Sequence, residues 1–371
     1  RDTVAGVDTL VSDTTNFGNL PWREVFTDSQ LQTLIEQGLA NNTDLQTAIL
    51  KVKEAQAALM TSRLAYAPML ALSPQGTISS FDKSAATKTY SLPVTASWEL
   101  DLFGNLLNAK RGSQVALLQT KAYRQAVQTQ IISGIANTYY TLLMLDKQLE
   151  ISEQTADVMK RNVETMRAMK DAGMTNAAAV AQSEAAYAQV IASLPAIRQS
   201  IREAENALCM LLRQAPQAIK RSTLEEQQLP TQFSVGVPLQ LLSNRPDVKA
   251  AEMNLASTYY NTNAARAAFY PQITISGSAG WTNSAGSVIV NPGKLLASVV
   301  GSLTQPLFYR GSNIARLKIA KAQQEEAKLA FQQTVLNAGS EVSNALSLYQ
   351  TTAEKTSARQ LQVESAEKGA E

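Results

Sequence analysis

The sequence has 371 residues, with 33 Lys and Arg against 31 Asp and Glu and a formal net charge of +2. This balance indicates neither a nucleic-acid partner nor an acidic surface as substrate. The chain has no histidine and a single cysteine, Cys209, which excludes an intrachain disulfide and a Cys-based zinc cluster and removes the commonest general base. We expect no catalytic residue, no cofactor and no metal site.

The first 100 residues predict an extended arm, a helix and two strands. We expect the arm over residues 1–23, with a first structural repeat over 24–212 that opens with the helix and continues with strands at 67–80 and 88–103. In the second strand Leu92, Val94 and Trp98 alternate with polar residues. Period two over about ten residues is typical of an outer-membrane barrel strand, with its apolar side toward lipid. Alternation by itself also fits a soluble sheet that rests on a core.

A long helical hairpin is predicted over residues 105–212. No proline occurs between Pro93 and Pro195, and apolar residues step by four or three along one face: Val127, Ile131, Ile135, Tyr139, Leu142, Leu145 and Leu149. A helix of about 68 residues is roughly 100 Å long, more than a compact core can cover. Gly173 suits a left-handed cap between the two helices, and Pro195 should bend the second helix without ending it. An ordinary coiled-coil stalk is the alternative interpretation.

The rest of the chain repeats the first part. After a linker at 213–237, a second repeat over 238–371 has an expected helix at 246–269, strands at 270–283 and 295–308, and a long helix at 311–371. Its first strand alternates at Ile273, Ile275 and Trp281. Arg63 aligns with Arg266 without a gap, and Gly104 aligns with Gly311, where each glycine should permit a strand-to-helix turn. The matching second hairpin turn is expected beyond Glu371.

Two acidic residues in the segment "WELDLFG" could be mistaken for a catalytic pair. Glu99 and Asp101 are two residues apart, so on a strand both would face the same way. Nothing in the sequence indicates a bound sugar or metal beside them. We expect both acids on the polar face of the strand, in a structural role.

Four strands cannot close a barrel, and open strand edges are not tolerated in lipid. Several copies must therefore pool their strands if these strands cross a membrane. Two copies would give eight strands and three would give twelve, and only the larger barrel leaves an open lumen.

Several segments together resemble the TolC-type outer-membrane factors, which serve tripartite efflux pumps and type I secretion. They include "SWELDLFGN" at Ser97–Asn105, "LTQPLFYRGSN" at Leu303–Asn313 and the hairpin segment "MKDAGMTNAAAV". The resemblance implies a mainly α fold with membrane β: a homotrimer with a twelve-stranded β-barrel and a tube of long periplasmic helices. It also implies a passive conduit for drugs and small toxic compounds in the outer membrane of a Gram-negative bacterium.

The resemblance also implies partners. These are a periplasmic adaptor (membrane fusion) protein, an inner-membrane transporter and outer-membrane lipid, with the adaptor contacting Gly173, Met174 and Thr175 at the hairpin tip. The constricting residues of the family would lie beyond Glu371. Many members carry an acylated N-terminal cysteine, whereas this sequence begins at Arg1. The alternative function is a periplasmic adaptor or coiled-coil scaffold, with a carboxylate enzyme third.

Overall fold

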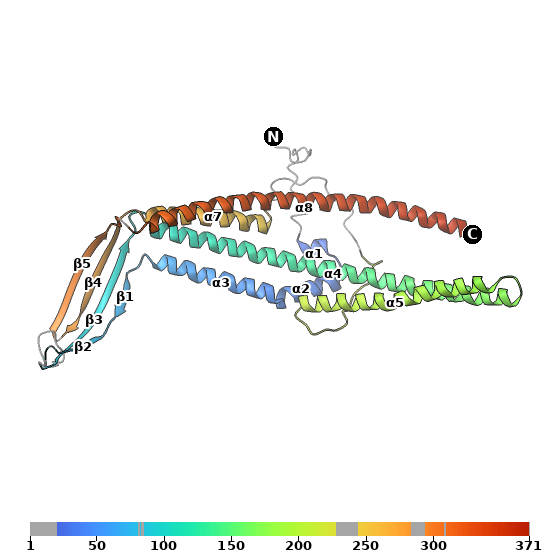
Figure 1. Cartoon of the computed structure of the whole chain (residues 1–371), viewed down its shortest axis with the longest axis horizontal. Coiled ribbons are helices and arrows are strands. Elements are labelled where there is room, and N and C mark those ends of the chain that lie inside the picture. Colours follow the sequence, from blue (N-terminus) through green and yellow to red (C-terminus); the bar gives the residue numbers. More distant parts are fainter. Residues whose placement is uncertain are drawn as a thin grey trace, which may run out of the picture. The chain divides into compact units, whose positions relative to one another are not determined.

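The computed structural model describes residues 21–80, 82, 85–227, 244–282, 294–307 and 309–370. Long helices dominate, and one antiparallel sheet accompanies them (Figure 1). The helices are α1 (Trp22–Val25), α2 (Ser29–Asn41), α3 (Thr43–Leu64), α4 (Asn105–Asp171), α5 (Ala177–Leu211), α7 (Pro246–Ala267) and α8 (Ser312–Ala370). The strands are β1 (Met69–Leu72), β2 (Gln75–Ser79), β3 (Thr87–Leu100), β4 (Gln272–Thr282) and β5 (Lys294–Thr304).

Residue contacts divide the chain into two compact units. We call residues 1–49 and 124–241 the core unit, and residues 50–123 and 242–371 the sheet unit. This division does not follow the two sequence repeats, because α3 and α4 are too long to belong to one compact core and each continues from one unit into the other. Most of the arm expected over 1–23, and residues 228–237 of the expected linker, lie outside the described residues.

The strand expected over residues 67–80 is interrupted. β1 and β2 both pair antiparallel with β3, and Leu72 lies opposite Val94 while Gln75 lies opposite Ser91. The two strands therefore share one register and act as a single strand broken at Pro74. A proline has no N–H to donate to the strand ladder, which accounts for the break. The sheet order is β1-β3-β4-β5, with β2 also on β3.

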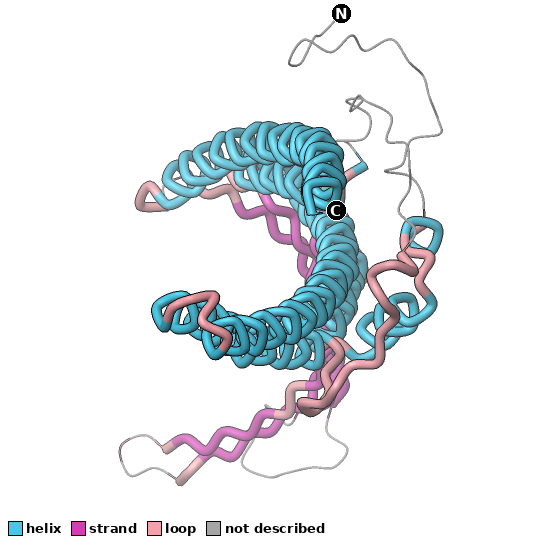
Figure 2. Tube along the Cα trace, turned by 90° about the vertical axis from the view of Figure 1, so that its right-hand side faces the viewer, coloured by secondary structure: helices cyan, strands magenta, loops and turns pink. Residues whose placement is uncertain are grey.

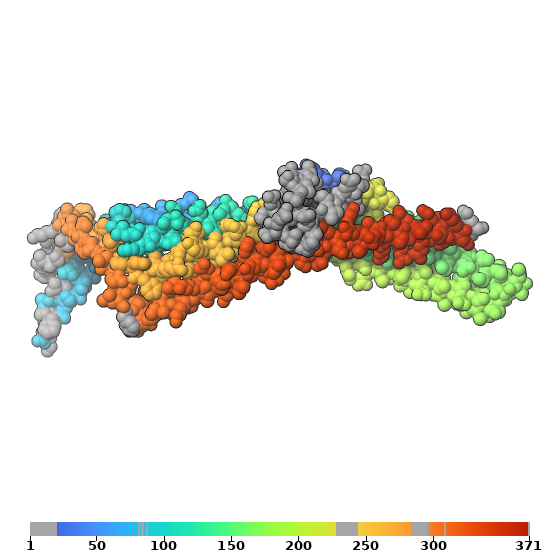
Figure 3. Space-filling view, turned by 90° about the horizontal axis from the view of Figure 1, so that it is seen from above, coloured from blue at the N-terminus to red at the C-terminus, as the bar shows by residue number. Residues whose placement is uncertain are grey.

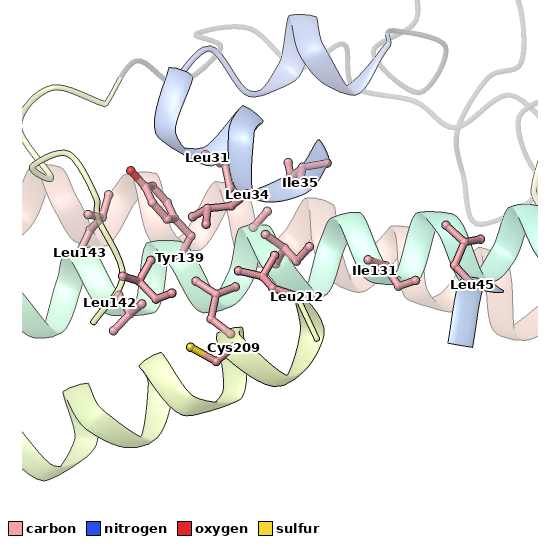
Figure 4. Close-up of a cluster of buried hydrophobic side chains, with 14 of the residues drawn as sticks. Leu31, Leu34, Ile35, Leu45, Ile131, Tyr139, Leu142, Leu143, Cys209 and Leu212 are labelled. Atoms are coloured by element: carbon pink, nitrogen blue, oxygen red, sulfur yellow. The ribbon is translucent and has the colours of Figure 1, made fainter. Parts of the chain in front are cut away.

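The apolar stripe predicted along α4 forms the centre of the core unit. Val127, Ile131, Ile135, Tyr139 and Leu142 are all at most 9% exposed, whereas Leu145 and Leu149 are half-buried, so the prediction is confirmed as far as Leu142. α2 and α5 pack on the stripe, as the close-up in Figure 4 shows for several of the side chains. Contact is close where α2 passes α4, since a Cβ on Gly38 would lie 2.3 Å from Ile135 Cδ1.

α4 and α5 form the predicted hairpin. Two ion pairs join the helices on its surface: Arg167 with Glu184 at 2.6 Å, and Arg198 with Glu153 at 2.8 Å. All four side chains are exposed, so each pair contributes only about 0.2–1 kcal/mol. α5 continues through Pro195. Cys209 is 1% exposed within the apolar cluster of α5 and α4, as expected for a small apolar helix residue.

Among the described helices, none has the combination of length and apolar composition that a membrane span requires.

Candidate functional site

One face of the sheet is apolar across every long strand. The register places Leu92 opposite Trp281, Val94 opposite Ala279, and Trp98 opposite Ile275. β5 continues the same face, since Ile273 lies opposite Leu303 and Trp281 opposite Leu295. The six residues that the sequence suggested as lipid-facing therefore lie on one face: Leu92, Val94, Trp98, Ile273, Ile275 and Trp281.

This apolar face is exposed to an unusual degree. Trp98 is 40% exposed, Trp281 is 46% and Val299 of β5 is 81%. Soluble monomers rarely leave so many large apolar side chains together in water. The soluble sheet resting on a core, which alternation alone would also fit, is therefore disfavoured.

The opposite face of the sheet is lined mostly by small polar side chains, with the exposed Met69 and Val300 as apolar exceptions. Thr95 lies opposite Ser278, and Ser278 lies opposite Ser298. The hydroxyl groups of Ser278 and Ser298 are 2.9 Å apart and hydrogen-bonded. Glu99 extends this face opposite Thr274. The sheet thus separates an apolar surface from a hydrated one.

Asp101 is not part of the strand, contrary to our expectation that it would share the polar strand face with Glu99. β3 ends at Leu100, and the Asp101 carboxylate instead accepts a hydrogen bond of 2.7 Å from the Leu107 N–H in the first turn of α4. An acidic group at this place satisfies an orphan helix donor and complements the helix dipole. Its role is to hold the strand-to-helix turn.

The junction glycines have left-handed backbones. Gly104 has φ of 76° and Gly311 has φ of 75°, a region that residues with a Cβ rarely adopt. Gly104 lies immediately before α4, and its carbonyl accepts 3.0 Å and 2.6 Å hydrogen bonds from the backbone N–H and side-chain amide of Asn108. Arg310 also has a positive φ, 50°, which is uncommon for a non-glycine residue.

Aromatic side chains gather where strands and helices meet. The Trp98 indole donates a 2.9 Å hydrogen bond to the Tyr66 carbonyl just beyond α3. The rings of Phe103 and Tyr270, one from each repeat, stack with centroids 5.1 Å apart. Sequence reasoning noted Trp98 and Trp281 but missed Tyr66, Phe103 and Tyr270. Their position within a few residues of a strand end was the signal that could have identified them.

The hairpin tip is a complete helix-capping motif. Gly173 has φ of 75°, its N–H donates to the Lys170 carbonyl, and the Met174 N–H donates to the Met169 carbonyl. These two bonds define a Schellman motif.

Asn176 is the N-cap of α5 and accepts a hydrogen bond from the Ala179 N–H. Gly173 and Met174 are exposed and Thr175 is half-buried.

The loop after α5 is fixed to the core unit by a polar cluster that sequence reasoning missed. Asp28, before α2, accepts hydrogen bonds from the Tyr139 hydroxyl at 2.7 Å, from Gln227 at 2.8 Å and from the Ser222 hydroxyl. Nearby, Arg221 forms ion pairs with Asp146 of α4 and Glu205 of α5. These contacts fix the loop to the residue before α2 and to α4 and α5, and Figure 2 draws the loops of the chain in pink and its helices in cyan.

The cluster contains two groups with shifted pKa values. Burial raises the pKa of Asp28, but hydrogen bonds from Ser222, Tyr139 and Gln227 outweigh it and lower the pKa to about 2. Burial, assisted by the Asp28 carboxylate, raises the pKa of Tyr139 to about 12. Neither group titrates near neutral pH, so the cluster is a structural tie with no role as an acid or base in that range.

A sheet with one exposed apolar face, attached to helices of 59 and 67 residues, defines a subunit of a membrane channel. The chain belongs to the outer membrane efflux protein family, whose model matches residues 34–212 and 237–371. It is 31% identical over 358 residues to the cation efflux system protein CusC of Escherichia coli, covering 95% of this chain and 77% of that protein. It is 28% identical to the toluene efflux pump outer membrane protein TtgC of Pseudomonas putida, covering 92% of this chain and 72% of the relative.

The solved structures agree. A crystal structure of CusC has a TM-score of 0.86 with this chain at 30% identity, covering 92% of this chain and 80% of CusC. The chain is thus an outer-membrane efflux channel subunit with a TolC-like fold, and the family is one of transport proteins.

Proposed function

We propose that three copies of this chain pool their strands into one closed barrel and their long helices into one tube. The observation that carries the proposal is the continuous apolar face that ends in open edges. Within the described residues, β5 pairs only with β4, and β1 and β2 pair only with β3. Unpaired strand edges cost several kcal/mol per polar group in lipid, so copies of the chain must satisfy one another's edges. Three copies leave an open lumen, whereas two would fill it with side chains.

The distance between Trp98 and Trp281 along the sheet supports the proposal that the strands cross a membrane. Trp281 lies opposite Leu92, and Trp98 lies six residues farther along β3. Six residues of strand correspond to about 20 Å, close to the ~25 Å apolar band of outer-membrane barrels. The apolar face would then contact lipid, with an aromatic group near each boundary.

Transport through this conduit is passive. The polar sheet face presents hydroxyl groups and the Glu99 carboxylate, which offer weak affinity for any one solute. The inner-membrane transporter would set the direction and the choice of substrate, and a periplasmic adaptor would connect the two. The named substrates of the relatives, cations and toluene, fit a conduit that accepts whatever its pump delivers.

The test is reconstitution in planar bilayers, with complementation of a deletion strain read beside trimer levels in membranes. Trimers that conduct ions and restore efflux support the conduit. A protein that stays at the membrane surface, does not conduct and acts only with another channel would instead be an adaptor or scaffold, the alternative function.

The adaptor contact is proposed at Gly173, Met174 and Thr175. Met174 is suited to test it, because its side chain is 72% exposed and only its backbone takes part in the cap. Met174→Glu should leave trimer levels unchanged and reduce efflux about tenfold or more, as expected for a charge buried in a small interface. Met210→Glu is the matched control, since Met210 is 79% exposed and lies on α5 far from the tip in sequence. Equal efflux from both variants would show that the hairpin tip is not the adaptor contact.

A further inference from the structure

The helix ends that adjoin the sheet carry an unbalanced positive charge. From Leu102 to Leu145 the sequence has four basic residues and no acidic one, and from Met253 to Gln324 it has six basic residues and no acidic one. The whole chain has a formal net charge of only +2. Basic residues are therefore concentrated in the same part of each repeat, although Glu99 and Asp101 directly precede the first of these segments.

The structure places these basic residues level with one another on paired helices. The hydroxyl groups of Ser62 on α3 and Ser113 on α4 are 2.7 Å apart, which brings Arg63 level with Lys110 and Arg111. In the second repeat the α7 residue Thr262 donates a hydrogen bond of 3.2 Å to the Ala320 carbonyl of α8. Asn313 of α8 donates one of 3.1 Å to the Ala268 carbonyl.

The second pair of contacts brackets Arg266 on α7 and brings it level with Arg316 on α8. The space-filling view in Figure 3 shows α7 lying along α8. Arg63 and Arg266 are equivalent in the repeat, and each lies in the last turn of the helix that precedes a strand. We call Arg63, Lys110, Arg266 and Arg316 the basic collar.

The collar is not paired with the carboxylate beside it, because Asp101 accepts hydrogen bonds from the Tyr66 hydroxyl at 3.4 Å and from the Leu107 N–H of α4. In the part of the chain that the structure describes, none of its four members forms a salt bridge. Arg266 donates instead to the Asn263 amide oxygen at 3.1 Å, and the Lys110 ammonium lies 5.5 Å from the Tyr66 ring centroid. Like charges brought together without a counter-charge are unfavourable, so this arrangement fits an anionic partner from outside the protomer.

The position of the collar indicates which anion. Trp98, on the apolar sheet face, donates to the Tyr66 carbonyl, and the Tyr66 ring contacts Lys110. This chain of contacts connects the apolar sheet face to Lys110 of the collar. Phosphate groups of phospholipids lie at this depth, just outside the hydrocarbon region.

We propose that the basic collar binds the phosphate headgroups of anionic phospholipids in the periplasmic leaflet of the outer membrane. The inference rests on the proposed orientation of the sheet, with its apolar face in lipid. Each basic residue near an anionic lipid surface contributes about 1 kcal/mol, or about fivefold in affinity. The collar would select phosphatidylglycerol over phosphatidylethanolamine and fix the height of the channel in the bilayer.

The experiment compares the lipids that purified trimers retain from vesicles of phosphatidylethanolamine and phosphatidylglycerol. The test variant replaces all four collar residues by glutamine. The matched control removes four exposed basic residues of α4 and α8 that are remote from the sheet in sequence, by substitution of Lys160, Arg161, Lys355 and Arg359 with glutamine. Mass spectrometry of the retained lipid gives the ratio of phosphatidylglycerol to phosphatidylethanolamine.

Wild type and control should both retain phosphatidylglycerol preferentially. In the collar variant the ratio of retained phosphatidylglycerol to phosphatidylethanolamine should be at least about fivefold lower. Wild-type preference should also fall as salt rises, because exposed charges are screened. An unchanged ratio in the collar variant, an equal loss in the control, or a salt-independent preference would overturn the proposal.

Three further outcomes separate this proposal from the proposed function on which it rests. If only the collar variant fails to form trimers, its residues pair with carboxylates of a neighbouring copy, and the lipid assignment is wrong. If wild type fails to insert into vesicles at all, the proposed membrane channel itself fails. If wild type inserts and conducts but shows no lipid preference, the lipid-binding proposal for the collar is wrong and the proposed membrane channel is unaffected.

Discussion

At the scale of single residues, close approach and backbone conformation decide which glycines are required. Gly280 lies in β4 opposite Pro93, and a Cβ there would lie 2.2 Å from the Leu92 carbonyl oxygen and 2.5 Å from the Pro93 Cα. Backbone atoms cannot move aside as a flexible side chain can. Gly277 on the same strand has ordinary room, with the nearest atom at 3.5 Å. The two positions look alike in the sequence.

Gly280→Ala should therefore destabilise the sheet by about 1–3 kcal/mol, the usual cost of overpacking, and reduce the trimer yield in outer membranes. Gly277→Ala should leave the yield near that of wild type. Heat-resistant trimer on gels and the thermal unfolding midpoint measure the effect. Similar behaviour of the two variants would mean that the close approach at Pro93 is not maintained in the assembled protein.

Asp28 gives a second residue-scale prediction, this one on pH. Its pKa is lowered to about 2 from an ordinary value of 3.8, so the folded state favours the ionised carboxylate. The sign follows from linkage: this stabilisation is fully present above about pH 4 and is lost as the pH falls toward 2. After allowance for solvent screening it amounts to about 1–2 kcal/mol.

Asp28→Asn keeps a helix-capping side chain but removes the charge. It should lower stability at neutral pH by about 1–2 kcal/mol and flatten the acid dependence between pH 4 and pH 2. Thermal unfolding followed by circular dichroism measures both effects. Asp44→Asn, in an exposed first turn of α3, is the control. A variant as acid-sensitive as wild type would assign the acid dependence to other groups.

At the scale of elements, the sheet is specified by which face each side chain takes. Val94 and Thr95 are adjacent on β3, yet the register puts them on the apolar and polar faces respectively. The alternation of any one strand also fits a soluble sheet that rests on a core. The agreement of β1, β3, β4 and β5 on one apolar face makes the assignment strong.

Val94→Arg should cost about 2–4 kcal/mol near the bilayer midplane and impair assembly. Thr95→Arg should assemble and change conductance instead, because its charge would remain in water. Trimer yield and single-channel conductance of both variants provide the comparison. Equal effects at the two positions would show that the assignment of faces to lipid and lumen is wrong.

At the scale of the whole molecule, the protomer is incomplete as a membrane structure. Within the described residues, β5 pairs only with β4, and β1 and β2 pair only with β3, so in the proposed trimer stability depends on other copies and on concentration. Mass photometry of the purified channel should give a particle of three times the 40.1 kDa protomer, apart from bound detergent. A particle of two protomers would instead imply an eight-stranded barrel without an open lumen.

The sequence by itself determined the long helices, the strands and their apolar faces, because these depend on periodicity and on the placement of proline and glycine. The stripe from Val127 to Leu142 and the alternation around Val94 follow from local geometry of helix and strand. The repeat likewise made Gly104 and Gly311 stand out as junction residues.

Only the tertiary structure decided what joins distant segments. Asp28, Tyr139 and Ser222 are far apart in the chain, and no spacing rule links them. Asp101 lies beyond the end of β3, because its carboxylate accepts a hydrogen bond from an N–H in the first turn of α4. Gly280 is a required glycine because Pro93 lies opposite it in the sheet and leaves no room for a Cβ. Such contacts depend on register and helix pairing, which long-range packing sets and local sequence pattern does not contain.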